Sequence, residues 1–154
     1  MSSFRRRGLL LGALALGACG FTPAFGPASA LRGTVRLGTP DSANAFDLVR
    51  ALEFRLGVVE TPRYDLRVTV DLDEEGSVIT RTSEIDRFSI EGEATYALFT
   101  VEGAPVTSGT ARAFASYSAS STPMATRAAR DDAQLRLMEM LADDIVASLA
   151  TAFE

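Results

Sequence analysis

The stretch YDLRVTVDLD, from Tyr64 to Asp73, has the most regular pattern in this sequence. Every second side chain is apolar, and the positions between hold only charged residues and one threonine. A period of two with one wholly polar face is typical of a β-strand that is buried on its other face. We therefore expect a sheet that is covered on one side and meets water or a polar partner on the other. The apolar positions are Tyr64, Leu66, Val68, Val70 and Leu72.

The residues after this strand predict two more strands. Residues 74–76 (EEG) are expected to form a turn, and a second extended stretch then runs over residues 77–101. Polar residues 81–84 interrupt it early, where we expect a loop or an irregular edge. A hairpin turn at residues 102–105 then leads to a return strand at residues 106–117. The apolar residues that share one parity in the second stretch are Phe88, Ile90, Ala94, Tyr96 and Leu98.

An amphipathic helix is predicted before these strands. A short strand at residues 34–37 comes first, and Asp41 or Ser42 can then cap a helix that ends at Gly57. Apolar residues within it recur at helical spacing, so they share one face. They are Ala45, Leu48, Val49, Leu52 and Leu56.

A second helix is predicted at the C-terminal end. Thr122 can serve as its N-cap with Pro123 at the first helical position, and the helix can run to about Phe153. Its apolar stripe is expected to consist of Leu135, Met138, Ala142, Ile145, Leu149 and Phe153.

The order strand, helix, three strands, helix predicts an α+β fold. Two amphipathic helices can cover one face of a four-stranded, mostly antiparallel sheet, which gives a two-layer sandwich. We expect residues 34–154 to form this single domain. Its core is predicted to be the apolar face of the 64–73 strand, packed on Leu48, Val49, Leu52, Ile145 and Leu149.

The N-terminus is typical of a bacterial lipoprotein signal. Three arginines, residues 5–7, precede an uncharged run of Gly, Leu and Ala, and Cys19 follows small residues in the sequence LGAC. A short buried helix or an uncleaved anchor fits poorly, since a membrane span needs about 20 apolar residues. We expect residues 1–18 to be cleaved, Cys19 to be lipidated, and residues 19–33 to form a lipidated tether. Gly20 rather than Asp follows the cysteine, which favours the periplasmic side of the outer membrane.

Composition excludes several classes of function. The sequence has no His, and the single Cys is the expected lipid acceptor, so Ser-His-Asp and Cys-His catalysis are impossible. Removal of the signal would leave 12 Arg against 20 acidic residues, a net charge of −8, which argues against nucleic-acid binding. The acidic pairs at residues 73–75, 131–132 and 143–144 are interpreted as solvated surface charge. We expect no enzymatic activity, no metal and no cofactor.

The chain resembles the lipopolysaccharide-assembly lipoprotein family, LptE. The resemblance rests on the opening CGFTPAFG at residues 19–26, on the helix from Phe46 to Gly57 with its exit at Val58, and on the order of elements. It implies an outer-membrane lipoprotein that is not an enzyme. Such proteins plug the lumen of the LptD β-barrel, help it to assemble and contact lipopolysaccharide. The runner-up is an unrelated outer-membrane lipoprotein that binds a small ligand or a cell-wall component.

The resemblance also implies a basic residue for lipopolysaccharide near the second strand. Arg81 occupies a similar place in the sequence, and Arg87 is a neighbour that could serve instead. Arg is suited to bidentate recognition of phosphate. An equal alternative is that both residues are ordinary surface arginines.

Overall fold

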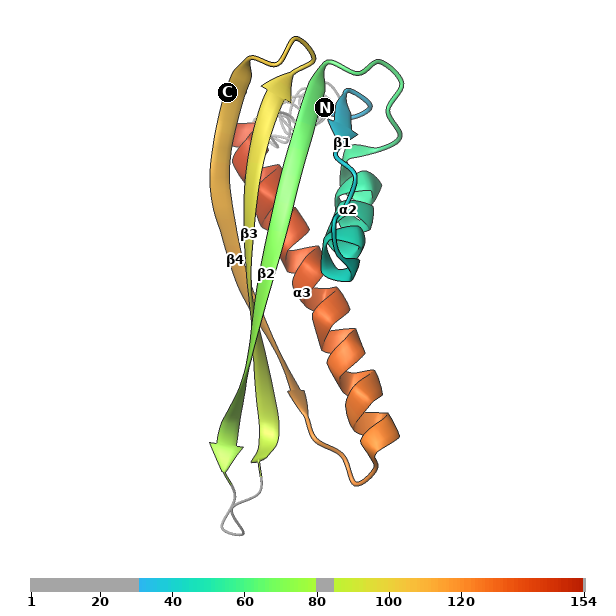
Figure 1. Cartoon of the computed structure of the whole chain (residues 1–154), viewed down its shortest axis with the longest axis vertical. Helices are drawn as coiled ribbons and strands as arrows, with labels where there is room; N and C mark the ends of the chain where they lie inside the picture. The colour runs from blue at the N-terminus through green and yellow to red at the C-terminus, as the bar shows by residue number, and fades with distance from the viewer. Residues whose placement is uncertain (1–30, 80–84, 154) are drawn as a thin grey trace, which may run out of the picture.

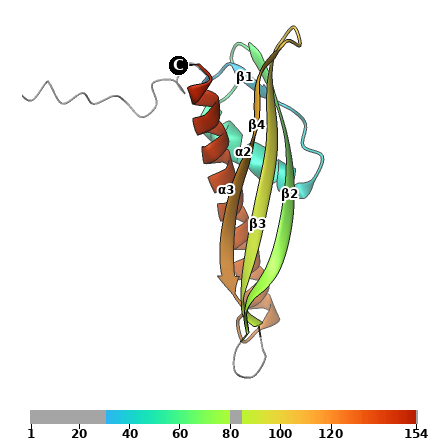
Figure 2. The same cartoon turned by 90° about the vertical axis from the view of Figure 1, so that its left-hand side faces the viewer.

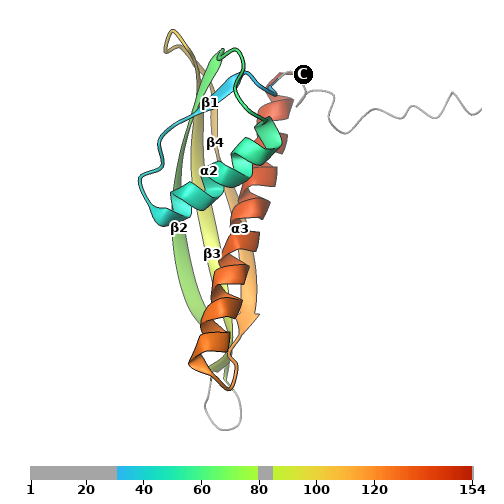
Figure 3. The same cartoon turned by 90° about the vertical axis from the view of Figure 1, so that its right-hand side faces the viewer.

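The computed structural model describes residues 31–79 and 85–153, which form one four-stranded sheet and two helices (Figure 1). The strands lie in the order β1-β2-β3-β4; β1 is parallel to β2, and the other neighbours are antiparallel. Both helices lie on the same side of this sheet (Figure 3). The predicted two-layer α+β fold is confirmed. The elements are β1 (Val35–Leu37), α2 (Ala43–Leu56), β2 (Tyr64–Ile79), β3 (Ile85–Thr100), β4 (Pro105–Ser118) and α3 (Pro123–Thr151).

Both helices begin and end where local chemistry favours it. The Ser42 side chain accepts a hydrogen bond from the Ala45 N–H at 3.1 Å, so Ser42 is the cap of α2. Gly57 ends α2 with φ +78°, a backbone conformation that favours glycine. Thr122 caps α3 with Pro123 next to it, as predicted.

The predicted turn at residues 74–76 is wrong. β2 continues through these residues to Ile79, and its pairing with β3 ends at Ile79 opposite Ile85. The second strand therefore begins at Ile85, not at Ser77. Acidic residues followed by glycine favour a turn locally. However, β3 begins at Ile85, and its backbone hydrogen bonds keep β2 extended through these residues. The register shifts after Gly76, which marks the irregularity that the glycine introduces.

The core matches the predicted faces with one exception. Leu66 is fully buried, and the other four apolar residues of the 64–73 pattern are half-buried and packed against the core. Leu135 was predicted on the buried stripe of α3, yet it is 41% exposed. The buried stripe runs instead through Leu137 and Leu141, and Leu135 is two residues, about 200° of helix rotation, from Leu137. The core also includes Leu31, which the sequence analysis placed in the tether.

The strands give the domain two distinct ends (Figure 1). The end called the tether end here holds Leu31 and the turn after β3, residues 101–104. The far end holds the last residues of β2, the first residues of β3 and the start of α3. Within the residues that the structure describes, no helix is long and apolar enough to cross a membrane.

Candidate functional site

Arg87 is the predicted ligand-binding residue that the structure places. It lies in β3 at the far end, opposite Val78 of β2 and Ser118 of β4. It is exposed, and its odd position in β3 puts it on the outer face of the sheet, away from the helices. Arg81 and Cys19, the other two predicted residues, lie outside the described residues. Arg87 is therefore free to meet a ligand at the far end of the domain.

A polar cluster on the inner face holds the far end together. The Glu74 carboxylate accepts hydrogen bonds from the Tyr117 hydroxyl and, at 2.8 Å, from the Arg130 guanidinium. The Phe88 ring stacks on Tyr117 with their centroids 5.1 Å apart. Glu74 was interpreted from the sequence as a solvated turn residue, and that interpretation is wrong. Its partners lie 43 and 56 residues away, so no local signal pointed to them.

The same cluster shifts two ionisation equilibria. The hydrogen bond from Arg130 lowers the pKa of Glu74, and the Tyr117 hydroxyl adds to this effect. Burial raises the pKa of Tyr117 to about 12, helped by its hydrogen bond to the Glu74 carboxylate. The cluster therefore favours a charged Glu74 and a neutral Tyr117 at physiological pH.

Replacement of Glu74 is expected to change how stability depends on acid. Since the pKa of Glu74 is lowered by folding, its contribution is present above the ordinary carboxyl pKa and is lost as the pH falls through the lowered value. Glu74→Gln should melt below wild type at neutral pH, and the difference in melting temperature should narrow as the pH falls below the ordinary carboxyl pKa. Thermal melts across this range check it, with Glu75→Gln as a charge-matched control. A difference that is constant with pH would contradict the assignment.

The outer face of the sheet is strongly acidic at its centre. Asp71 lies directly opposite Glu93, and Asp73 directly opposite Glu91, although like charges in such pairs are destabilising. Arg112 of β4 binds Glu93 at 2.6 Å and is the only cation that lines this hollow of about 530 Å³. This arrangement offers an acidic surface to a basic partner.

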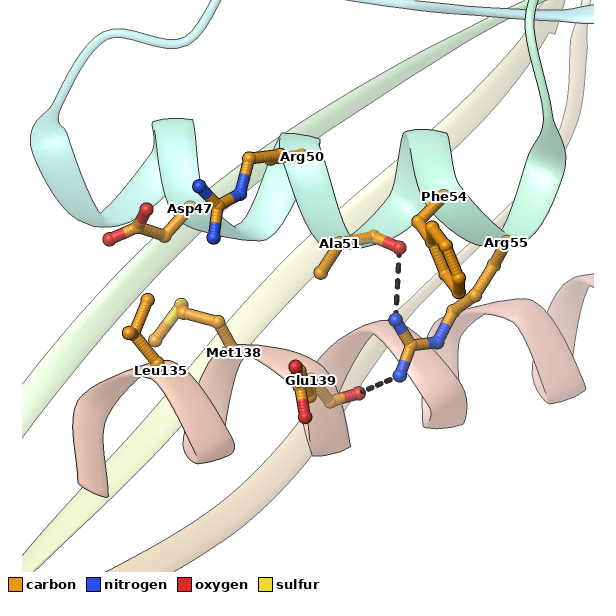
Figure 4. Close-up of a pocket in the computed structure, with 8 residues that line it drawn as sticks. All are labelled: Asp47, Arg50, Ala51, Phe54, Arg55, Leu135, Met138 and Glu139. Atoms are coloured by element: carbon orange, nitrogen blue, oxygen red, sulfur yellow. Dashed lines mark hydrogen bonds between the residues drawn. The ribbon is translucent and has the colours of Figure 1, made fainter. Parts of the chain in front are cut away.

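A second hollow lies between α2 and α3 (Figure 4). Arg55 closes one end of it, donating to the Ala51 carbonyl at 3.0 Å, to the Glu139 carbonyl at 3.1 Å and to the Asp143 carboxylate at 2.5 Å. Phe54, beside Arg55, is 85% exposed. Arg55 thus fastens the two helices together, and Asp143 is an ion-pair partner rather than free surface charge.

These surfaces carry charged and exposed aromatic groups that are suited to binding. Among residues 31–79 and 85–153, no three His, Cys, Asp or Glu side chains are grouped so that they could hold a metal. The Glu74 and Asp143 carboxylates accept hydrogen bonds from arginines, which lowers their pKa and favours the charged form. The described site residues therefore offer recognition through charge and exposed aromatic groups.

The fold is similar to that of several solved lipoproteins. The chain matches no protein-family model, and no curated protein matches its sequence. A protein of Caulobacter crescentus described as a lipoprotein is 22% identical, with 82% of this chain and 94% of that one covered and a TM-score of 0.68. Rare lipoprotein B of Shewanella oneidensis is 13% identical, with 77% and 92% covered and a TM-score of 0.57. Lipoprotein B of Nitrosomonas europaea is also 13% identical, with 77% and 82% covered and a TM-score of 0.57. The chain therefore shares its fold with these solved lipoproteins.

Proposed function

We propose that this chain is the lipoprotein subunit of the lipopolysaccharide transport machinery, which plugs the LptD barrel, assists its assembly and contacts lipopolysaccharide. The observation that carries the proposal is that a fold shared with rare lipoprotein B, a name of the LptE family, follows a lipoprotein signal that ends at Cys19. Neither feature alone specifies the family, since folds host many functions. Together with the opening at residues 19–26, they favour this one.

The position of the tether supports an orientation for the proposed plug. Leu31 is buried in the core, so the chain from Cys19 enters the fold at the tether end. The 12 residues from 19 to 30 can reach at most about 40 Å. The tether end is thereby kept near the leaflet that holds the lipid, and the far end with Arg87 points away from it. A plug with this orientation would present Arg87 to lipopolysaccharide inside the barrel.

The surface of the domain is compatible with enclosure by a barrel. The outer face of the sheet carries Arg67, Thr69, Asp71 and Glu93 between few apolar groups. Barrels of the outer membrane have polar, wet interiors. A polar sheet face suits such an interior, whereas placing its charged side chains in a lipid bilayer would cost free energy.

Depletion of the protein is expected to reduce assembled LptD barrel and surface lipopolysaccharide together. Both would be measured in outer membranes, by immunoblotting of the barrel and by labelling of intact cells. The acylated protein, purified from the same membranes, should bring the barrel with it. Cys19→Ser, which should lose palmitate labelling, serves to separate anchoring from plugging. A normal barrel and normal surface lipopolysaccharide after depletion would exclude the proposal, and a retained small solute would favour the runner-up.

The two candidate arginines are tested in separate arms of that experiment. Arg87→Asp should still retain the barrel, since Arg87 is exposed and such charge changes shift stability by only about 0.5 kcal/mol, and Arg81→Asp is expected to retain it too. The variant at the true contact should bind purified lipopolysaccharide about tenfold more weakly, because a charge-assisted contact is replaced by repulsion. Arg127→Asp, an exposed arginine of α3, is the matched control. Wild-type binding by both variants would make them ordinary surface residues.

A further inference from the structure

The sheet has two free edges that differ in how they are protected. β4 ends the strand order, and β1 is so short that β2 is uncovered beyond Leu66. Natural proteins usually guard such edges with charged side chains, because an open edge recruits other strands. β2 is guarded in this way, with charged residues at 65, 67, 71, 73, 74 and 75. β4 carries one charged residue, Arg112, among its 14.

The backbone of β4 from Thr110 to Phe114 is available along this open edge. The carbonyl of Ser116 accepts a hydrogen bond from Arg136 of α3, so it points away from β3. Residues in a strand direct their N–H and C=O groups alternately to either side. Pairing with β3 is regular from Thr107 to Ser118, so the backbone groups of Thr110, Arg112 and Phe114 point the same way as those of Ser116. These donors and acceptors match those of another extended chain.

A groove flanks the edge on its helix side. β4 and α3 lie side by side there (Figure 2), with a hollow of about 390 Å³ between them. Met140 is 40% exposed on the α3 wall of this groove, while the Phe114 side chain, 67% exposed, lies on the outer face of the sheet beside the same edge. A strand edge beside a helix, with apolar pockets for alternate side chains, is the geometry in which extended peptides bind by strand addition.

The charge of the surface beside the β4 edge indicates which kind of strand would bind there. Phe114 also borders the acidic hollow of the outer face, and Glu139 lines the groove with no ion pair to another described residue. A segment with basic side chains would neutralise both surfaces. A second copy of this chain would place two acidic faces side by side, so self-pairing is disfavoured.

We propose that β4 is the docking edge for a basic, extended segment of a partner protein, which adds to the sheet as a fifth strand. Its backbone pairs with Thr110, Arg112 and Phe114, and an apolar side chain on its helix-facing side lies beside Met140. Basic side chains on its other face meet Glu91 and Glu93. The proposal stands apart from the identity of the partner and from the function proposed above.

The test uses the mature chain, residues 19–154, in detergent micelles and a capped seven-residue peptide that alternates arginine and valine. Amide resonances of Thr110, Arg112, Phe114 and Ser116 should shift on titration, and those of β2 from Arg67 onward should not. N-methylation of the peptide's alternate amides should weaken binding by about tenfold or more, since it removes the inter-strand hydrogen bonds. A peptide that alternates glutamate and valine should not bind.

Variants separate edge docking from simple charge attraction. Met140→Lys should weaken binding while folding normally, because Met140 lines the groove and is 40% exposed. Thr69→Lys adds the same charge to the outer face of β2 and should bind as wild type does. The proposal fails if no resonance shifts up to about 1 mM peptide, or if the N-methylated peptide binds equally well. It also fails if the only amide resonances that shift belong to residues such as Glu91 and Glu93 of the outer face, and none belong to β4. A dimer detected by analytical ultracentrifugation would likewise contradict it.

Discussion

Leu66→Asp is expected to unfold the protein. Leu66 is fully buried near the start of β2, with Leu98 opposite it on β3, and the described residues include no buried charged side chain that could pair with a carboxylate there. An unpaired carboxylate at this position costs several kcal/mol even after its pKa has shifted. That loss is comparable to the whole stability of a typical domain, about 5–15 kcal/mol. Circular dichroism of the purified variant should show no cooperative thermal transition.

Aspartate substitutions at two neighbouring positions of β2 serve as graded controls for this experiment. Val68, on the same face, is half-buried and packed against the core, so Val68→Asp should destabilise by less than the change at Leu66. Thr69 is exposed on the outer face, and Thr69→Asp should alter stability by about 0.5 kcal/mol. The expected order of damage is therefore Leu66, then Val68, then Thr69. Equal effects at Leu66 and Thr69 would contradict the assignment of a buried and an exposed face to β2.

Gly92→Val is expected to cause the second large loss of stability. A Cβ atom placed on Gly92 would lie 3.1 Å from methyl carbons of Leu137 and Leu141 and 3.2 Å from one of Leu72. The glycine therefore sets how closely α3 approaches the sheet. Valine adds two further carbons to that contact, and overpacking of this kind costs about 1–3 kcal/mol. Chemical denaturation at equilibrium measures the loss.

Matched substitutions show whether volume is the cause. Gly92→Ala should lose less than Gly92→Val, since a single methyl group requires the leucines to move by only a few tenths of an ångström. Thr95→Val puts valine on the exposed outer face of the same strand and should be nearly neutral. If Gly92→Val is as stable as wild type, α3 does not pack on β3 as closely as described.

A second glycine, in the pairing of β3 and β4, is also required by close packing, and the sequence did not reveal this. Gly109 lies opposite Tyr96, whose ring covers it so closely that a Cβ would fall 2.5 Å from the hydroxyl oxygen. A glycine in a strand often marks such a close approach. Its partner is known only once the register of the two strands is known.

The sequence by itself determined the features that depend on neighbours a few residues away. Alternation along residues 64–73 assigned Leu66 and Thr69 to opposite faces, because side-chain direction in a strand has a period of two. Thr122 with Pro123 located the start of α3, because capping involves only the first turn. The order of these elements was enough for the two-layer fold.

Tertiary structure alone decided what depends on residues far apart in the chain. Glu74 lies in a strand rather than a turn because β3, Tyr117 and Arg130 are there to pair with it. Leu135 is exposed because the sheet meets a different stripe of α3, which includes Leu137 and Leu141. The open edge of β4 likewise follows from strand order, which is a property of the assembled sheet and not of any segment in it.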